Sequence, residues 1–198
     1  MRGDPFLEFL SVLEKEGFEV TQNSFIKPDL AFVLATVGQA EKPTTRVLYL
    51  KKFTGNEFVF FTHEDSKKGE DIAFNENVSA CIFFPASLRQ IRIEGRAVIG
   101  KQEEANEYWE TRQALSKAGG ILSKQSQILP NYEEFVIEAH KLAEEKSPLL
   151  KPETWVSYHI IADEFEFWEG APNRLNLRTK YKKDLNFKDS WFKTHLYP

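Results

Sequence analysis

Hydrophobic and polar residues alternate along several segments of the chain, and this period of two is typical of half-buried β-strands. The longest alternating segment covers residues 88–100, where Ile91, Ile93, Ala97 and Ile99 face one way and mostly charged residues face the other. Such a strand fits an antiparallel sheet with one wet or ligand-facing side. The same pattern predicts strands over residues 31–37, 45–53, 57–62, 78–84, 88–100, 155–162, 165–168, 174–181 and 191–196.

Other segments follow the period of a helix. The first has an apolar face and is preceded by Asp4, a residue type that caps helices well. The last is preceded by Asn131, which can cap its first turn in the same way. Helices are expected over residues 5–16, 67–75, 102–115 and 131–146, and turns at residues 54–56, 170–173 and 183–186.

The order of these elements indicates the fold class. Many antiparallel strands with a few intervening helices favour an α+β barrel or sandwich over a doubly wound parallel fold. The 17 phenylalanine residues also favour sheet. Since no linker, repeat or low-complexity tract interrupts the 198 residues, a single domain over residues 1–198 is expected.

Composition excludes several classes of function. With 26 Lys and Arg against 30 Asp and Glu, the formal net charge is -4, which argues against a protein that grips nucleic acid along a basic surface. The single cysteine, Cys81, excludes an internal disulfide and a cysteine-based zinc site, and the four histidines are scattered, so no metal site is expected. The chain lacks a long apolar segment and an N-terminal signal pattern, and we therefore expect a cytoplasmic protein without a membrane span.

Three residues on the expected helix 102–115 and just after it could bind a phosphate group. Tyr108, Arg112 and Ser116 are spaced four apart, so on one helix they would share a face. A phenol, a guanidinium and a hydroxyl on one face suit a phosphate monoester, because arginine offers a two-pronged donor and the others add directed hydrogen bonds. The alternative is a solvated helix face, which by itself is the commoner explanation of such a spacing.

Two other clusters carry positive charge. Arg174, Asn176 and Arg178 alternate along the expected strand 174–181 and would project from one face, where an anion would offset the repulsion between the arginines. Lys67 and Lys68 open a helix, whose N-terminal end favours anions. A solvated strand face and a surface lysine pair are the alternatives.

The segment Arg-Val-Leu-Tyr-Leu-Lys at residues 46–51 places a charge at each end of an apolar strand. The odd spacing puts Arg46 and Lys51 on opposite faces unless a bulge intervenes. A core strand with charged ends is the plain interpretation. The chain contains no glycine-rich dinucleotide or P-loop motif and no nucleophile elbow.

Taken in order, these segments resemble the pyridoxine (pyridoxamine) 5′-phosphate oxidase family, flavoproteins with the FMN-binding split-barrel fold. The resemblance covers nearly the whole chain from Asp4 and is most specific at residues 46–51, at Ser-Lys-Gln-Ser 123–126 and at residues 166–178. It implies an antiparallel split β-barrel with flanking helices. It also implies a homodimer with FMN at the interface.

The resemblance further implies a set of site residues. The substrate phosphate would be bound by Lys51, Tyr108, Arg112 and Ser116, and the substrate ring by Arg174 and Asn176, which would be the catalytic residues. FMN would be held by Arg46, Val47, Leu48, Lys51, Phe61, Thr62, Lys67, Lys68, Gln90, Gln125, Ser126, Trp168 and Arg178.

The implied activity is an FMN-dependent oxidation of pyridoxamine or pyridoxine 5′-phosphate to pyridoxal 5′-phosphate, with molecular oxygen as acceptor and hydrogen peroxide as product. Two alternatives stay open: a related flavin oxidase acting on another small reduced ring, such as a phenazine precursor, and a non-catalytic module that binds flavin, haem or pyridoxal phosphate. The chain departs from the family pattern at Phe61 (usually Tyr), Lys67 (usually Arg) and Asn176 (usually His). Asparagine keeps hydrogen bonding but cannot titrate near neutral pH.

Overall fold

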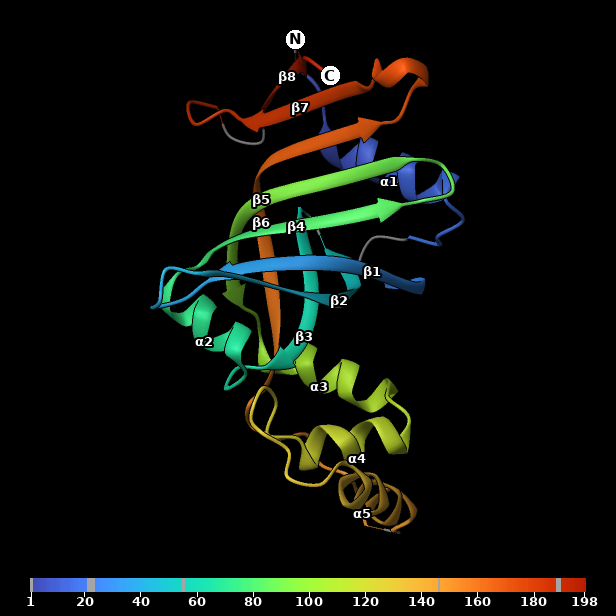
Figure 1. Ribbon diagram of the computed structural model, residues 1–198, viewed down its shortest axis with the longest axis vertical. Coiled ribbons are helices and arrows are strands. Elements are labelled where there is room, and N and C mark those ends of the chain that lie inside the picture. The colour runs from blue at the N-terminus through green and yellow to red at the C-terminus, as the bar shows by residue number, and fades with distance from the viewer. Residues whose placement is uncertain (1, 21–23, 55, 146, 188–189) are drawn as a thin grey trace.

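The core of the computed structural model, which describes residues 2–20, 24–54, 56–145, 147–187 and 190–198, is a barrel of six antiparallel strands (Figure 1). Their order is β3-β2-β1-β4-β5-β6, and pairing of β3 with β6 closes the barrel. The closure is partial, because β2 pairs with β3 only from Lys52 to Thr54 and the rest of that edge of β2 has no strand beside it in the described residues. The strands are β1 (Phe25–Val37), β2 (Pro43–Thr54), β3 (Glu57–His63), β4 (Asn77–Phe84), β5 (Arg89–Ile99) and β6 (Trp155–Glu169).

Strand β6 also extends the sheet beyond the barrel. Its first half pairs with β3, and its second half pairs with β7 (Leu177–Lys183), which in turn pairs with β8 (Trp191–Leu196). The sequence pattern predicted two strands here, but a bulge at Asp163 joins them, because Glu94 and Gly95 of β5 face Glu164 and Ala162. No side chain fits opposite this bulge: a Cβ at Gly95 would lie 2.1 Å from the Ile161 carbonyl oxygen.

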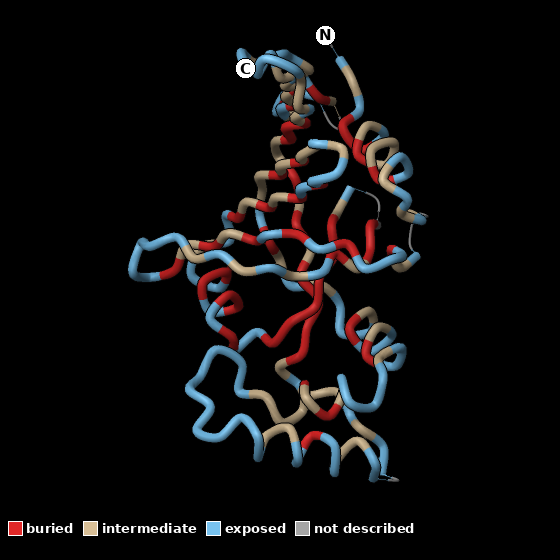
Figure 2. Tube along the Cα trace, turned by 45° about the vertical axis from the view of Figure 1, so that its right-hand side comes forward, coloured by how far each residue is buried: buried red, intermediate tan, exposed pale blue. Residues whose placement is uncertain are grey.

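The helices lie outside the barrel (Figure 1). Helix α1 (Pro5–Lys15) is capped by Asp4, whose Oδ1 accepts the Phe6 amide hydrogen at 2.9 Å. The helix buries Phe6, Phe9 and Leu13 against the barrel core. Figure 2 shows buried residues along the barrel strands and on one side of α1.

Among the described residues no helix is long and apolar enough to cross a membrane. The other helices are α2 (Lys67–Phe74), α3 (Gln102–Thr111), α4 (Ala114–Leu122), α5 (Tyr132–Glu144) and the short 3-10 helix η1 (Pro172–Arg174).

The prediction of one helix over residues 102–115 is wrong. Helix α3 ends at Thr111, because Arg112 has an extended backbone with φ −77° and ψ 144°, and α4 begins only at Ala114. Tyr108, Arg112 and Ser116 therefore do not share one helix face. Period-based reasoning extended the helix through a break that no proline or glycine marks.

The prediction of a strand over residues 174–181 is wrong at its start. Arg174 lies in η1 with a left-handed φ of 61°, and β7 begins at Leu177. The Asn176 Oδ1 accepts the Ala171 amide hydrogen at 3.1 Å and so closes the turn before β7. Arg174, Asn176 and Arg178 thus do not project from one strand face.

Smaller differences concern element ends. Strand β1 begins at Phe25, six residues before the expected start at residue 31, and Ile99 is 52 % exposed although its spacing placed it with the buried residues of β5. The expected turn at 183–186 is confirmed, since Asp184 Oδ1 accepts the Asn186 amide hydrogen. Gly55 in the expected turn 54–56 and Lys146 at the end of the expected last helix lie outside the described residues.

A histidine between two carboxylates joins α3 to the barrel. The Nδ1 of His159 on β6 lies 2.5 Å from Oε2 of Glu57 on β3, and its Nε2 lies 2.6 Å from Oε2 of Glu104 on α3. The hydrogen bond with Glu104 is the main cause that raises the pKa of His159, the bond with Glu57 adds to it, and burial opposes both. Lys52 also approaches Glu104, with Nζ 3.5 Å from Oε1. The charged imidazolium, which donates from both nitrogens, is thus the form that the fold stabilises.

We predict that this contact makes stability depend on pH in the alkaline direction. Because the folded-state pKa of His159 is raised, its stabilisation is complete below the ordinary histidine pKa of about 6.5 and is lost as pH rises through the folded-state value. Between pH 6 and pH 9 the unfolding free energy of the wild type should therefore fall relative to that of His159→Gln, by up to roughly 1.5–3 kcal/mol. Thermal unfolding midpoints of the two proteins, measured across this range, would show the change. A difference that stays constant across this range would contradict the assignment.

Candidate active site

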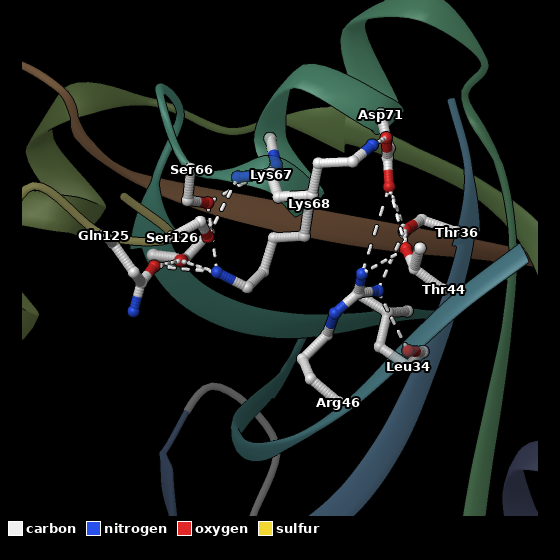
Figure 3. A network of polar contacts seen from close by, with 12 residues as sticks. Leu34, Thr36, Thr44, Arg46, Ser66, Lys67, Lys68, Asp71, Gln125 and Ser126 are labelled. Carbon is white, nitrogen blue, oxygen red and sulfur yellow. Dashed lines mark hydrogen bonds and ion pairs between the residues drawn. The ribbon is translucent and has the colours of Figure 1, made fainter. Parts of the chain in front are cut away.

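A buried lysine lies at the centre of a network of polar contacts between β3, the start of α2 and the loop after α4 (Figure 3). We call this network, together with Arg46, the polar pocket. Lys68 is 5 % exposed, and its Nζ donates to Gln125 Oε1 at 2.7 Å, Ser66 Oγ at 3.0 Å and Thr62 Oγ1 at 3.1 Å. Burial, together with the positive charge of Arg46, lowers its pKa to about 8. These three contacts use all three protons of the ammonium group, so an anion that accepts from Lys68 would have to replace one of them.

The first turn of α2 is fixed by local contacts. Ser66 Oγ accepts the Gly69 amide hydrogen at 3.4 Å, as expected of an N-cap, and a Cβ at Gly69 would lie only 2.1 Å from the Glu64 carbonyl oxygen. The close approach at Gly69 presses the helix start against the end of β3. Ser126, with a left-handed φ of 74°, accepts the Lys67 amide hydrogen at 3.1 Å and joins the loop to the same turn.

Arg46 adds a third cation from β2. Its Nη1 donates to the Leu34 carbonyl oxygen at 3.0 Å and to Thr36 Oγ1 at 2.9 Å, and its Nη2 donates to Thr44 Oγ1 at 2.6 Å. Burial lowers the pKa of Arg46, and the charge of Asp71 opposes this effect. The pocket therefore gathers three positive groups together with hydroxyl and amide donors, a set that suits a phosphate monoester.

A cleft of about 390 Å³ runs along the outer side of β2. The Phe61 and Tyr108 rings stack within it, with centroids 4.1 Å apart. Lys51 lies 5.7 Å from the Tyr108 ring centroid and pairs with Asp29. The lining residues are Val47, Leu48, Tyr49, Lys51, Phe61, Tyr108, Arg112, Ser116 and Trp155.

Arg112 enters this cleft although it does not lie on a helix. Its guanidinium carbon lies 4.3 Å from the centroid of Trp155 and 5.2 Å from that of Trp109, and its Nη2 donates to the Ser116 carbonyl oxygen at 2.8 Å. Burial is the main cause that lowers the pKa of Arg112. Within the described part of the chain, its Nε is buried and has no hydrogen-bond partner. Stacking on the two tryptophan rings, rather than a position on a helix, thus orients the Arg112 side chain.

A second group of predicted residues lies on another part of the sheet. Gln90, Trp168 and Arg178 face one another across β5, β6 and β7. Arg178 donates from Nε to Glu166 Oε1 at 2.8 Å and from Nη1 to the Tyr197 carbonyl oxygen at 3.1 Å. The hydrogen bond to Glu166 raises the pKa of Arg178.

The cleft and the group of Gln90, Trp168 and Arg178 lie on the same face of one continuous sheet, which we call the outer face. A single row of paired residues crosses it from Val47 through Val33, Cys81 and Arg92 to Glu166. From β2 to β5 this row spans three strand spacings, about 14 Å. The polar pocket contains Arg46, Thr62, Lys67, Lys68, Gln125 and Ser126, the cleft contains Val47, Leu48, Lys51, Phe61, Tyr108, Arg112 and Ser116, and Gln90, Trp168, Arg174, Asn176 and Arg178 lie apart from both.

The sequence analysis did not single out several residues that shape the pocket. Thr36 and Thr44 hold Arg46, and Asp71 accepts hydrogen bonds from both threonines. One signal was available, because Asp71 follows Lys67 by four residues and so shares its helix face. The stacking of Trp155 on Arg112 could not be inferred from the sequence, because the two residues lie 43 positions apart in the chain.

Comparison with known proteins places this site in a family. Residues 19–146 match the family model described as pyridoxamine 5′-phosphate oxidase, and residues 155–198 match the model described as the pyridoxine 5′-phosphate oxidase C-terminal dimerisation region. A pyridoxine/pyridoxamine 5′-phosphate oxidase of Xylella fastidiosa is 38% identical over 202 residues, which cover 98% of this chain and 94% of the relative. The enzyme of the same name from Ehrlichia chaffeensis is 37% identical over 174 residues, 87% of each chain.

The solved structures agree with this placement. PhzG from Burkholderia lata, in complex with tetrahydrophenazine-1-carboxylic acid, is 26% identical and covers 98% of this chain and 93% of its own, with a TM-score of 0.85. The fold is that of the split-barrel flavoproteins. The chain belongs to the pyridoxamine 5′-phosphate oxidase family.

We predict that anion binding in the polar pocket weakens as pH rises through about 8. Above this value Lys68 loses its proton in the unliganded protein, so a bound dianion must restore the proton at a cost. Sulfate is a suitable probe because its charge is constant from pH 7 to pH 9.5, and its binding raises the unfolding midpoint. The sulfate-dependent rise should shrink across this range in the wild type but not in Lys68→Arg. Equal behaviour of the two proteins would contradict the role of Lys68.

Proposed function

We propose that this chain is a cytoplasmic FMN-dependent oxidase that converts pyridoxamine or pyridoxine 5′-phosphate to pyridoxal 5′-phosphate. For the amine, substrate, oxygen and water yield aldehyde, ammonia and hydrogen peroxide. The observation that carries the proposal is that one chain holds two separate sets of phosphate donors, the polar pocket around Lys68 and the cleft around Arg112. A phosphorylated cofactor and a phosphorylated substrate require two such sets.

The residues of the polar pocket fit the phosphate end of FMN. Arg46 and Lys68 lie close enough for the charge of one to lower the pKa of the other, and a dianion between them would remove this repulsion. Lys67, Thr62, Gln125 and Ser126 would complete the phosphate site, and Val47, Leu48 and Phe61 would contact the rest of the cofactor. When bound, FMN supplies the two-electron redox chemistry between substrate and oxygen.

The cleft would bind the substrate phosphate. Arg112 has an unpartnered Nε among the described residues, and Lys51, Tyr108 and Ser116 add an ammonium and two hydroxyl groups around the same space. Stacking on Trp155 and Trp109 would hold the Arg112 guanidinium in place and exclude water from one of its faces. The side chains would thus anchor the phosphate and leave the ring free to be oriented by other groups.

We further propose that the active site is completed in a homodimer. The outer sheet face between the cleft and the group of Gln90, Trp168 and Arg178 carries exposed apolar side chains. Val33 is 38 % exposed, Val47 is 64 % exposed and Phe83 is 52 % exposed. A second copy seated there would bring the partner subunit's Trp168 and Arg178 towards the cleft, where FMN would lie at the interface. Arg174 and Asn176 would then orient the substrate ring as catalytic residues. The family model of residues 155–198, named as a dimerisation region, supports this arrangement.

The C-terminal strands support a single domain over the whole chain. Strands β7 and β8 continue the sheet of the barrel through β6, so their backbone hydrogen bonds depend on the barrel being folded.

The alternative of a phenazine-type oxidase gains from the likeness to PhzG, whose bound ligand is a carboxylic acid. The donor set of Lys51, Tyr108, Arg112 and Ser116 suits a phosphate better.

The proposed activity is tested on the purified protein. We expect a yellow protein that releases FMN rather than FAD on denaturation, because the pocket offers one phosphate site and the chain has no dinucleotide loop. Addition of pyridoxamine 5′-phosphate in air should release hydrogen peroxide, and unphosphorylated pyridoxamine should be a poor substrate. A haem spectrum, or bound FMN without peroxide release, would favour the non-catalytic alternative.

Replacement of Arg112 by alanine should affect substrate far more than cofactor. The loss of a charged hydrogen bond is expected to raise KM for the phosphorylated substrate about 10- to 150-fold, while the FMN dissociation constant changes little. Arg96→Ala is the matched control, since Arg96 is exposed and pairs only with Glu76 among the described residues. If Arg112→Ala and Arg96→Ala had the same KM, the cleft would not be the phosphate site.

A further inference from the structure

A buried carboxylate lies behind the cations of the polar pocket and has no part in the function described so far. Asp71 on α2 is 1 % exposed. Its Oδ2 accepts hydrogen bonds from Thr36 Oγ1 at 2.8 Å and Thr44 Oγ1 at 2.9 Å, and Lys67 pairs with its other oxygen (Figure 3). Arg46 Nη2 lies 3.9 Å from Oδ2, too far for a direct hydrogen bond.

The threonines transmit the orientation of this carboxylate to Arg46. A hydroxyl has one proton, and since an ionised carboxylate can only accept, Thr36 and Thr44 both direct their protons to Asp71. Their lone pairs are then free to accept from Arg46, at 2.9 Å from Nη1 and 2.6 Å from Nη2. Without the carboxylate the hydroxyl protons could turn towards the guanidinium, where they would repel it.

Donor counting shows which edge of Arg46 is left for a ligand. Of its five N–H groups, those of Nη1 go to Leu34 and Thr36, and one of Nη2 goes to Thr44. Among the described residues this leaves Nε–H and the second Nη2–H, a pair able to bind two oxygens of one phosphate group. The contacts behind Arg46 therefore select the edge that it presents.

The surroundings of Asp71 are built for an ionised group. Burial would raise the pKa of Asp71, but the hydrogen bonds from Lys67, Thr36 and Thr44 outweigh burial and hold the pKa below its usual value. The space depends on a glycine, since a Cβ at Gly38 would lie 2.0 Å from the Asp71 Oδ1 atom. Burial of a charge carries a desolvation cost, and removal of one partner from such a network is strongly unfavourable because it leaves the others uncompensated.

We infer that Asp71 is a positioning residue of the cofactor-phosphate site, which orients Arg46 through Thr36 and Thr44 and holds Lys67 directly. Asp71 itself does not contact the phosphate. The inference rests on the proposed function, because it assumes that the pocket binds the phosphate of FMN.

The inference is testable because the loss of charge and the loss of positioning in Asp71→Asn have opposite expected effects on phosphate binding. Removal of a negative charge beside the pocket would by Coulomb attraction alone tighten the binding of a phosphate dianion. The amide of asparagine keeps one acceptor oxygen and replaces the other by an NH2 group that can only donate, so it cannot accept from both the threonines and Lys67. This loss of positioning would weaken the binding. We expect the second effect to prevail, with a dissociation constant for FMN about 10- to 100-fold higher than in the wild type.

The experiment titrates flavin-free protein with FMN and with riboflavin, which lacks the phosphate, and follows quenching of flavin fluorescence. Asp71→Asn should lose affinity for FMN while its affinity for riboflavin changes less than about threefold, because a general loss of structure would weaken both ligands alike. Thr44→Val leaves the carboxylate in place and should weaken FMN in the same direction, which keeps the test valid if Asp71→Asn does not fold. Asp65→Asn is the control, since it removes an exposed negative charge six residues before Asp71.

The possible failures are distinguishable. A wild-type protein that binds no FMN would overturn the proposed function and the inference together. A wild type that binds FMN, with an Asp71→Asn variant that binds it equally or more tightly, would overturn the inference alone. Equal weakening of FMN and riboflavin in Asp71→Asn and Thr44→Val would also overturn it, because Asp71 would then serve the fold rather than the phosphate.

Discussion

Strand β6 is the element on which both halves of the molecule depend. One of its edges pairs with β5, and the other pairs first with β3, which closes the barrel, and then with β7, which leaves it. The bulge at Asp163, opposite Gly95, lies where the partner changes. The same strand sets Trp155 against Arg112 and Trp168 beside Arg178, so a shift of β6 would move both groups of site residues.

The second constraint is electrostatic. The polar pocket brings together the buried Lys68, the half-buried Arg46 and the exposed Lys67. Burial of the first two charges is unfavourable unless acceptors surround them. Hydroxyl, amide and carbonyl oxygens from five separate segments provide these acceptors, and Asp71 supplies the one carboxylate bonded to this set among the described residues. The cations repel one another in the folded protein before any anion binds, and a bound anion would reduce this repulsion. The repulsion therefore favours anion binding.

Much of the fold could be predicted from local pattern. The alternation in β5, the N-caps at Asp4 and Asn131 and the strand 191–196 agree with the structure because each depends on neighbours in the sequence. The errors have a common cause. Helix α3 stops at Thr111 because Arg112 packs on Trp155, and the start of β7 is delayed because Asn176 bonds to Ala171, and periodicity records neither contact.

The sequence by itself determined which chemistry is available: the order of motifs, the charged ends of residues 46–51 and the lysine pair at the start of α2. The strand period of two also predicted that Arg46 and Lys51 face opposite sides unless a bulge intervenes, and in the structure they do face opposite sides. Only the tertiary structure decided that one of these faces lines a cleft and that the other faces Asp71. Barrel closure and helix docking bring together residues far apart in the chain, and the energy of a buried charge depends on those distant partners rather than on its sequence neighbours.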